Sequence, residues 1–154
     1  MRSSRDDVLD LFDHVWQRFR RRMEGLGDEE WRWQPTSDVR LTLRWRLAHV
    51  AEFLRAGRNG PWLGLAAGQA DTDGGPAAEA GSAADALAGA DAAFARWRAQ
   101  LAAVADESFA RPVGAVGGDY GEATRCSFAL HVADELIHHT AEAALLRDLY
   151  AGRG

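Results

Sequence analysis

The chain has 154 residues, of which 47% are hydrophobic, a formal net charge of −5 and one cysteine, Cys126. The mixed acidic balance argues against a nucleic-acid-binding protein, which would present a basic face, and no apolar run is long enough to span a membrane. An intramolecular disulfide is excluded, and the N-terminus lacks the apolar core of a signal peptide, so we expect a single cytoplasmic domain over residues 1–154.

The N-terminal third of the chain contains two amphipathic segments. The first has Ser3 or Ser4 as a candidate N-cap, and Gly25 and Gly27 mark its end. Its apolar residues recur at alternating steps of three and four, as in a helix: Leu9, Phe12, Trp16, Phe19, Met23 and Leu26. After a polar connection that contains Trp31 and Trp33, the second helix should begin near Leu41 and weaken at Gly57 or at Gly60-Pro61. Its stripe consists of Trp45, His49, Phe53 and Ala56.

Two further helices are predicted in the second half. Residues 68–82 are rich in Gly and Asp, which indicates a surface loop before a third helix over about 83–104. Residues 107–124 form another expected loop, with a short extended piece around 112–116. The fourth helix should run over about 124–150. Four amphipathic helices with few strand signals predict an all-α fold, an antiparallel four-helix bundle.

The fourth predicted helix places ionisable residues in the middle of an apolar stripe. At about 100° per residue, one face holds Phe128, Val132, Glu135, His139, Glu142 and Leu146. A carboxylate buried without a partner is costly, so Glu135 requires compensation. Either these residues are satisfied by ordinary core hydrogen bonds, or Glu135 and His139, one turn apart, bind a metal ion.

A third metal ligand would come from a facing helix, and His49 is the candidate because it lies mid-helix between Trp45 and Phe53. Three protein ligands with an open fourth position are typical of a catalytic site. In this scheme His131, one turn before Glu135, would orient that carboxylate. His138 lies off the axis of the site and is either solvent-facing or an outer partner.

Other metal motifs fit less well. Glu135-Leu-Ile-His138 matches the Glu-x-x-His pattern of di-iron bundles once, whereas such sites need a second copy and further inward glutamates. The His-Glu-x-x-His motif of zincin proteases is absent. A mononuclear site therefore remains the metal hypothesis.

Three stretches resemble the DinB-like superfamily, which includes the mycothiol-dependent maleylpyruvate isomerases: EEWRWQP, LTLRWRLAHVAEF around His49, and the C-terminal HVADELIHHTAEAALLRDLY. The resemblance implies a four-helix bundle connected up-down-down-up. It also implies a divalent metal, zinc or nickel, bound by a histidine of the second helix and a pair of residues one turn apart on the last. Glu135 and His139 match the Glu-x-x-x-His form of the isomerase-like members, and His49 matches the single histidine.

The resemblance implies a low-molecular-weight thiol as co-substrate and a homodimer as a common assembly. Only AGRG follows Tyr150, whereas the isomerases carry an additional domain, so we do not expect maleylpyruvate isomerisation itself. The leading hypothesis is a metal-dependent, mycothiol-type S-transferase acting on small electrophiles, with Trp45 and Phe53 lining its pocket. The alternatives are a metal-dependent hydrolase and a non-catalytic, stress-associated dimer that binds a metal or a small molecule.

Overall fold

The computed structural model describes residues 1–67 and 78–154, and this part of the chain is helical apart from its connections. In chain order the helices are α1 Ser4–Arg22, α2 Asp28–Arg32, α3 Leu43–Leu54, α4 Asn59–Trp62, α5 Ala83–Ala103, α6 Asp106–Phe109, the 3-10 helix η1 Ala115–Tyr120, and α7 Arg125–Ala151. The predicted all-α class is confirmed. Within the described ranges no helix combines the length and apolar character that crossing a membrane requires.

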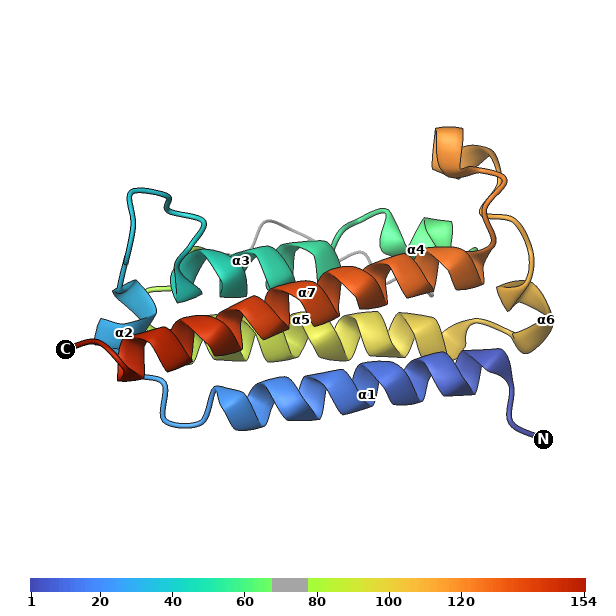
Figure 1. Cartoon of the computed structure of the whole chain (residues 1–154). Coiled ribbons are helices and arrows are strands. Elements are labelled where there is room, and N and C mark those ends of the chain that lie inside the picture. The colour runs from blue at the N-terminus through green and yellow to red at the C-terminus, as the bar shows by residue number, and fades with distance from the viewer. Residues whose placement is uncertain (68–77) are drawn as a thin grey trace.

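The four long helices α1, α3, α5 and α7 form a bundle whose connection order is up-down-down-up (Figure 1). α1 and α7 run in one direction, and α3 and α5 run in the other. α3 packs on α5 and α7, and α1 packs on the same two helices from the other side. The order that the resemblance implied is therefore confirmed, and it places α3 beside α7, the two helices with the candidate metal ligands.

Each long helix begins at a hydroxyl side chain that accepts a hydrogen bond from a backbone N–H of the first turn. These N-caps are Ser3, Thr42, Ser82 and Thr124. Such caps pair N–H groups that have no partner within the helix. Ser3, not Ser4, caps α1, where Asp6 completes a capping box. Thr42 sets the start of α3 at Leu43, two residues after the predicted start.

The connections contain short helices that periodicity did not predict. The polar connection after α1 includes α2, whose Trp31 is only 2% exposed. α4 contains Gly60 and Pro61, which were expected to weaken or end a longer second helix; that helix already ends at Leu54. Residues 107–124 hold the end of α6 and all of η1. The extended piece expected around 112–116 reduces to one antiparallel bridge between Pro112 and Thr124.

The predicted surface loop over residues 68–82 falls mostly outside the described residues. Its last part, residues 78–82, is described and leads into α5 through the cap at Ser82.

The core lies along the axis of the bundle and is rich in aromatic side chains. Trp16 of α1 stacks on Phe94 of α5 with 4.4 Å between ring centroids, and Phe12 meets Trp97 edge-on at 5.4 Å. Of the predicted α1 stripe, Leu9 and Leu26 are only partly buried, and Val8 and Val15 are buried instead. Leu136 of α7 is fully buried in the same cluster. This core supports α7 on the side away from its ionisable residues.

Candidate metal centre

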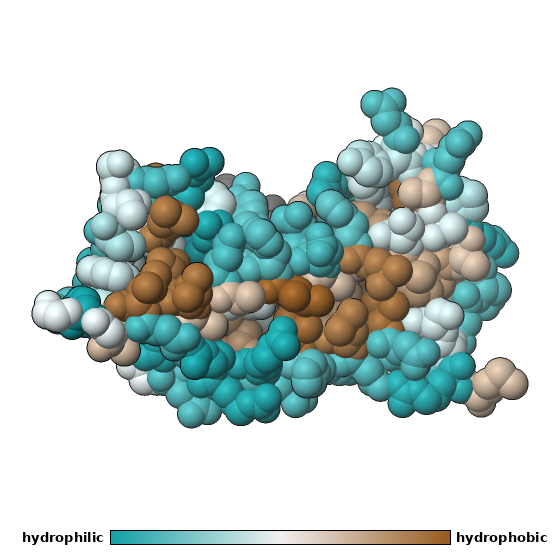
Figure 2. All heavy atoms as spheres, viewed as in Figure 1, coloured by the Kyte–Doolittle hydropathy of each residue, from teal (hydrophilic) through white to brown (hydrophobic). Residues whose placement is uncertain are grey.

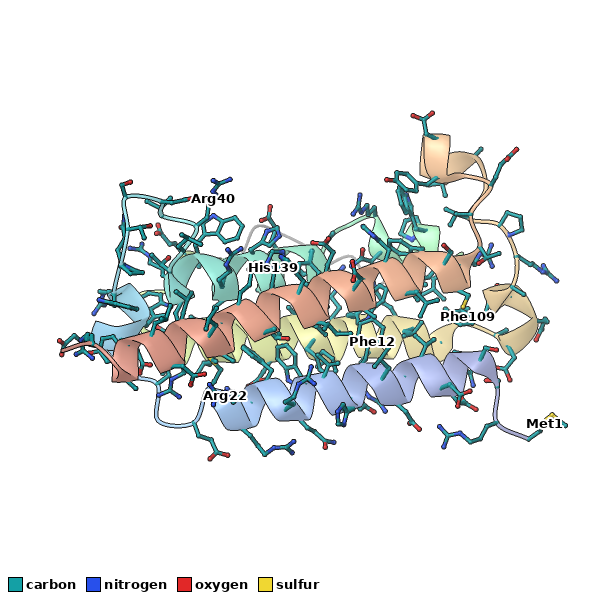
Figure 3. All side chains as sticks on the ribbon, in the orientation of Figure 1. Met1, Phe12, Arg22, Arg40, Phe109 and His139 are labelled. Atoms are coloured by element: carbon teal, nitrogen blue, oxygen red, sulfur yellow. The ribbon has the colours of Figure 1, made fainter. Side chains whose placement is uncertain are left out.

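His49 of α3 and Glu135 and His139 of α7 lie together in the folded chain. One possible ligand atom from each residue lies within 4.8 Å of the other two. The rings of His49 and His139 meet edge-on, with 4.6 Å between their centroids. Figure 3 shows His139 where α7 passes α3. Residues that are far apart in the sequence thus present two imidazoles and one carboxylate to a common point.

Helix geometry explains the pair on α7. Residues four apart lie one above the other on a helix, and the Nε2 atom of His139 is 3.3 Å from the Oε2 atom of Glu135. His49 lies in the middle of α3, which packs against α7. The three residues therefore meet because of one helix repeat and one helix–helix contact.

Aromatic side chains of α3 surround the imidazoles. Trp45 stacks on His49 at 4.6 Å and an interplanar angle of 19°. Phe53, one turn further along α3, lies 5.7 Å from His49 and 6.2 Å from His139, measured between ring centroids. Trp45, one turn before His49, and Phe53, one turn after it, thus supply apolar surface beside His49. The sequence led us to expect these two residues in the pocket.

Two of the three residues, His49 and Glu135, are partly exposed at the outside of the bundle, whereas His139 is buried. The exposed fraction of the side chain is 30% for His49, 40% for Glu135 and 10% for His139. Hydrophilic residues gather over the edge where α3 and α7 meet, and the outline of the molecule is hollowed there between the loop before α3 and η1 (Figure 2). The partly exposed side chains of His49 and Glu135 are therefore in contact with solvent.

The surroundings of His49 lower the pKa of its imidazole and so favour its neutral form. Burial lowers the pKa of its imidazole, and the neighbouring His139 lowers it further, whereas Glu52 and Glu135 act in the opposite direction. A metal binds the neutral imidazole, so protons compete less for His49 than for an exposed histidine.

Two residues that contact the Nδ1 atom of His139 had no role assigned to them from the sequence. Arg46 of α3 and Glu142 of α7 form an ion pair of 2.8 Å, and both lie within 3.2 Å of the Nδ1 atom of His139. Glu142 also contacts the Nε2 atom of His138 at 2.8 Å. Arg46 lies three residues before His49, and Glu142 lies three residues after His139. This helical spacing could have indicated that both lie close to the histidines.

A second group of possible ligands overlaps the first. His138, His139 and Glu142 also have ligand atoms within 4.8 Å of one another. In this group, however, the guanidinium of Arg46 already provides the positive charge beside Glu142. Glu135 has no arginine partner in the part of the chain that the structure describes; it contacts His139 instead. The first group is therefore the better candidate for a cation.

The remaining candidates are not part of this group of three, although the ring of His138 lies 4.9 Å from the ring of His139, measured between centroids. His131 is exposed, and no hydrogen bond joins it to Glu135 among the described residues. The side chain of His138 is 63% exposed and contacts Glu142. Burial raises the pKa of the Cys126 thiol, which keeps it protonated at neutral pH and unsuited to act as a nucleophile.

A groove of about 790 Å³ runs along another flank of α3. Its described lining includes Trp31, Trp45, Ala48, Glu52 and Asp85, and none of the three converging residues. Trp45 and Glu52 line the groove and also contact His49: Trp45 stacks on the imidazole, and Glu52 lies 3.8 Å from the Nδ1 atom of His49. The groove thus adjoins the candidate metal centre through these two side chains.

Comparison with known proteins identifies the family of the chain. The family model described as the DinB superfamily matches residues 11–143, a range that contains the four long helices in large part and all three converging residues. A search of curated proteins and a search of solved structures found no match. Because the family model covers most of the chain, the protein belongs to the DinB superfamily.

Proposed function

We propose that the protein is a metal-dependent enzyme that transfers a low-molecular-weight thiol of the mycothiol type to small electrophiles. His49, Glu135 and His139 would hold one divalent ion, zinc or nickel, and leave a coordination position open for the thiol sulfur. The observation that supports this most directly is the convergence of the three side chains from two helices.

The separation of the two ligand atoms on α7 fits one small cation. Ligands about 2.0–2.2 Å from a tetrahedral zinc ion lie about 3.3–3.6 Å from each other. The Nε2 atom of His139 and the Oε2 atom of Glu135 are 3.3 Å apart. Two imidazoles and one carboxylate are a ligand set that zinc accepts in catalytic sites. A divalent ion would also compensate the charge of Glu135, which no arginine neutralises within the described ranges.

The side chains around these ligands suit a thiol and an apolar electrophile. A bound divalent metal would supply a Lewis acid that keeps a coordinated thiol deprotonated near neutral pH. The thiol sulfur would form a bond to an electrophilic carbon. The displaced electron pair would move onto the leaving group or into the electrophile, and the thiol proton would pass to solvent. Trp45 and Phe53 would exclude water from one side of the reacting atoms. The thiol must come from outside, because Cys126 is partly buried with a raised pKa.

The first test measures metal binding. Zinc and nickel would be quantified in the purified protein by elemental analysis, and zinc affinity would be measured by calorimetry after chelation. We expect one ion per chain and the loss of most of it in His49→Ala. The matched control is His14→Ala, which removes an exposed histidine of α1 and should leave the metal content unchanged. Full metal occupancy in His49→Ala would refute the ligand assignment.

The second test measures turnover. The zinc-loaded and nickel-loaded proteins would be incubated with thiols and small electrophiles, and consumption of both partners would be followed. We expect consumption that requires thiol and metal together. Turnover without thiol would support metal-assisted hydrolysis instead. A fully folded protein that binds neither ion would overturn the proposal in favour of a non-catalytic binding role.

A further inference from the structure

The groove beside α3 has a floor of small side chains. Ala48 and Ala51 of α3 line it together with Ala86 and Gly89 of α5, the helix that packs on α3. Where the residues between two packed helices are this small, the space above them stays open. The groove volume of about 790 Å³ falls within the range of about 300–1,000 Å³ that small-molecule sites occupy. The groove is therefore large enough for an organic molecule beside the candidate metal centre.

Gly89 is a residue that neither the backbone nor the packing of α5 requires. A glycine in the interior of a helix is less favourable than an alanine, and Gly89 lies well inside α5. Its φ is not in the left-handed region, and a Cβ added to it would meet no described atom within 4 Å. A larger side chain at this position would instead enter the space of the groove. Keeping that space open is the physical role that remains for Gly89.

Two tryptophans give the groove aromatic walls. Trp45 lines it and also stacks on His49, with 4.6 Å between the ring centroids. Trp31 lines it as well and is 2% exposed, and its indole N–H is buried without an acceptor among the described residues. Buried donors without a partner are rare in folded proteins, and an oxygen of a bound molecule is an acceptor that the described chain does not supply. Because indole rings pack well against other aromatic rings, these walls suit an aromatic molecule that carries an oxygen.

The charges around the groove are balanced. Its described lining contains three arginines and three carboxylates: Arg32, Arg44, Arg55, Glu52, Glu79 and Asp85. Two of them, Arg44 and Glu79, form an ion pair with each other. Equal numbers of opposite charges favour neither an anion nor a cation, and a charged molecule would lose hydration on entering a space lined by small and aromatic side chains. The described lining is therefore suited to an uncharged molecule.

We propose that the groove binds the uncharged aromatic body of the electrophile and presents its reactive carbon, beside Trp45, to the candidate metal centre. This inference rests on the proposed function for the reaction, whereas binding of an uncharged aromatic molecule in the groove can be tested separately. In the reaction, the thiol sulfur forms a bond to the carbon of the electrophile and the bond to the leaving group breaks. The leaving group departs with the electron pair, and the thiol proton passes to solvent.

Binding is tested with two matched fluorescent probes and the purified full-length chain. N-phenyl-1-naphthylamine is uncharged, and 8-anilinonaphthalene-1-sulfonate has the same aromatic body with one negative charge. The fluorescence of both rises in apolar surroundings, so both can be titrated in the same way. We expect one binding site per chain for the uncharged probe and weaker binding of the sulfonate. No binding of the uncharged probe, or equal or tighter binding of the sulfonate, would overturn the inference.

Substitutions that fill the groove locate the bound probe. Gly89→Leu should lower the affinity for N-phenyl-1-naphthylamine at least about 10-fold, the lower end of what one methylene group changes in an apolar pocket. Its Tm should not fall, because leucine has the higher helix propensity. Ala48→Leu fills the same space from α3 and should also lower the affinity. The matched control is Ala99→Leu, at an exposed position of α5 outside the groove and about 15 Å further along the helix, which should leave the affinity unchanged. Unchanged affinity in Gly89→Leu and Ala48→Leu would overturn the inference.

Turnover of a large and a small electrophile separates this inference from the proposed function. With mycothiol as the thiol, kcat/KM would be measured for 1-chloro-2,4-dinitrobenzene, an uncharged aromatic molecule with nitro oxygens, and for iodoacetamide, which is too small to need the groove. The ratio of the two values should fall in Gly89→Leu and stay unchanged in Ala99→Leu. No turnover of either electrophile by the wild type refutes the proposed function, while the probe titrations still test the groove. Turnover with an unchanged ratio in Gly89→Leu refutes the role of the groove and leaves the proposed function intact.

Discussion

Replacement of Arg147 by Met should destabilise the protein more than any exposed charge substitution. Arg147 of α7 donates to both carboxylate oxygens of Glu30 at 2.9 and 3.1 Å, and to the backbone carbonyls of Arg22 and Glu24 at 2.9 and 2.6 Å. The side chains of Arg147 and Glu30 are only 18% and 11% exposed. This one residue thus joins α7 to α2 and to the end of α1.

The expected loss in free energy of unfolding follows from the unpaired Glu30 carboxylate that remains after the substitution. Removing one partner of a buried ion pair leaves an uncompensated charge, which costs about 3–5 kcal/mol. Because both side chains retain some exposure, we expect about 3 kcal/mol for Arg147→Met. That value is a large fraction of the 5–15 kcal/mol that stabilises a typical domain. It corresponds to a decrease in Tm of about 6–12 °C for a chain of this size.

Urea unfolding at pH 7, followed by circular dichroism, would measure this loss in the metal-free protein. The control is Arg153→Ala, whose ion pair with Glu29 spans 4.0 Å and is largely exposed, with an expected change below about 0.5 kcal/mol. The double variant Arg147→Met/Glu30→Leu should recover much of the stability, because it removes the unpaired carboxylate. A loss below about 1 kcal/mol for Arg147→Met would refute the reasoning.

Three further predictions concern local features of the same structure. Thr42→Ala removes the N-cap of α3, whose hydroxyl accepts from the N–H of Trp45 at 3.1 Å, and should cost about 1 kcal/mol in urea unfolding. NMR titration of the metal-free protein should show the pKa of His49 below its ordinary value because of burial, and Glu52→Gln should lower it further. Since the pKa of His49 is lowered in the folded protein, its contribution to stability is complete above the unfolded pKa of about 6.5 and is lost as the pH falls. His49→Gln should abolish this pH-dependent part of the stability. Asp38 should titrate with a pKa of about 2, chiefly because the Arg40 side chain donates to its carboxylate, and Arg40→Gln should raise this value in a ¹³C carboxyl titration.

The long helices were predictable because their cause is local. Steps of three and four between apolar residues, such as Phe12, Trp16 and Phe19, place them on one face whatever surrounds the helix. The hydroxyl caps are equally local. The short helices were not predictable, because four or five residues are too few to show a period. α2 depends on Trp31, which the fold buries to 2% exposure.

Two of the three residues of the candidate metal centre could be derived from spacing on a single helix. Glu135 and His139 lie one turn apart on α7 in any fold that contains this helix, and the structure separates their nearest ligand atoms by 3.3 Å. The approach of His49 to this pair is different, because it depends on the packing of α3 against α7. His131, which shares the helix with Glu135, could not be placed by spacing alone, and the bundle leaves it exposed.

The sequence by itself determined the all-α class, the four long helices and the pair of possible ligands one turn apart, since each depends on contacts between residues close along the chain. Only the tertiary structure decided that Arg46 meets Glu142 and His139, that Arg147 joins α7 to Glu30, and that His49 completes the group of three. The physical reason is that these contacts depend on the relative rotation and register of packed helices. Those are set by the whole core together, and no single segment specifies them.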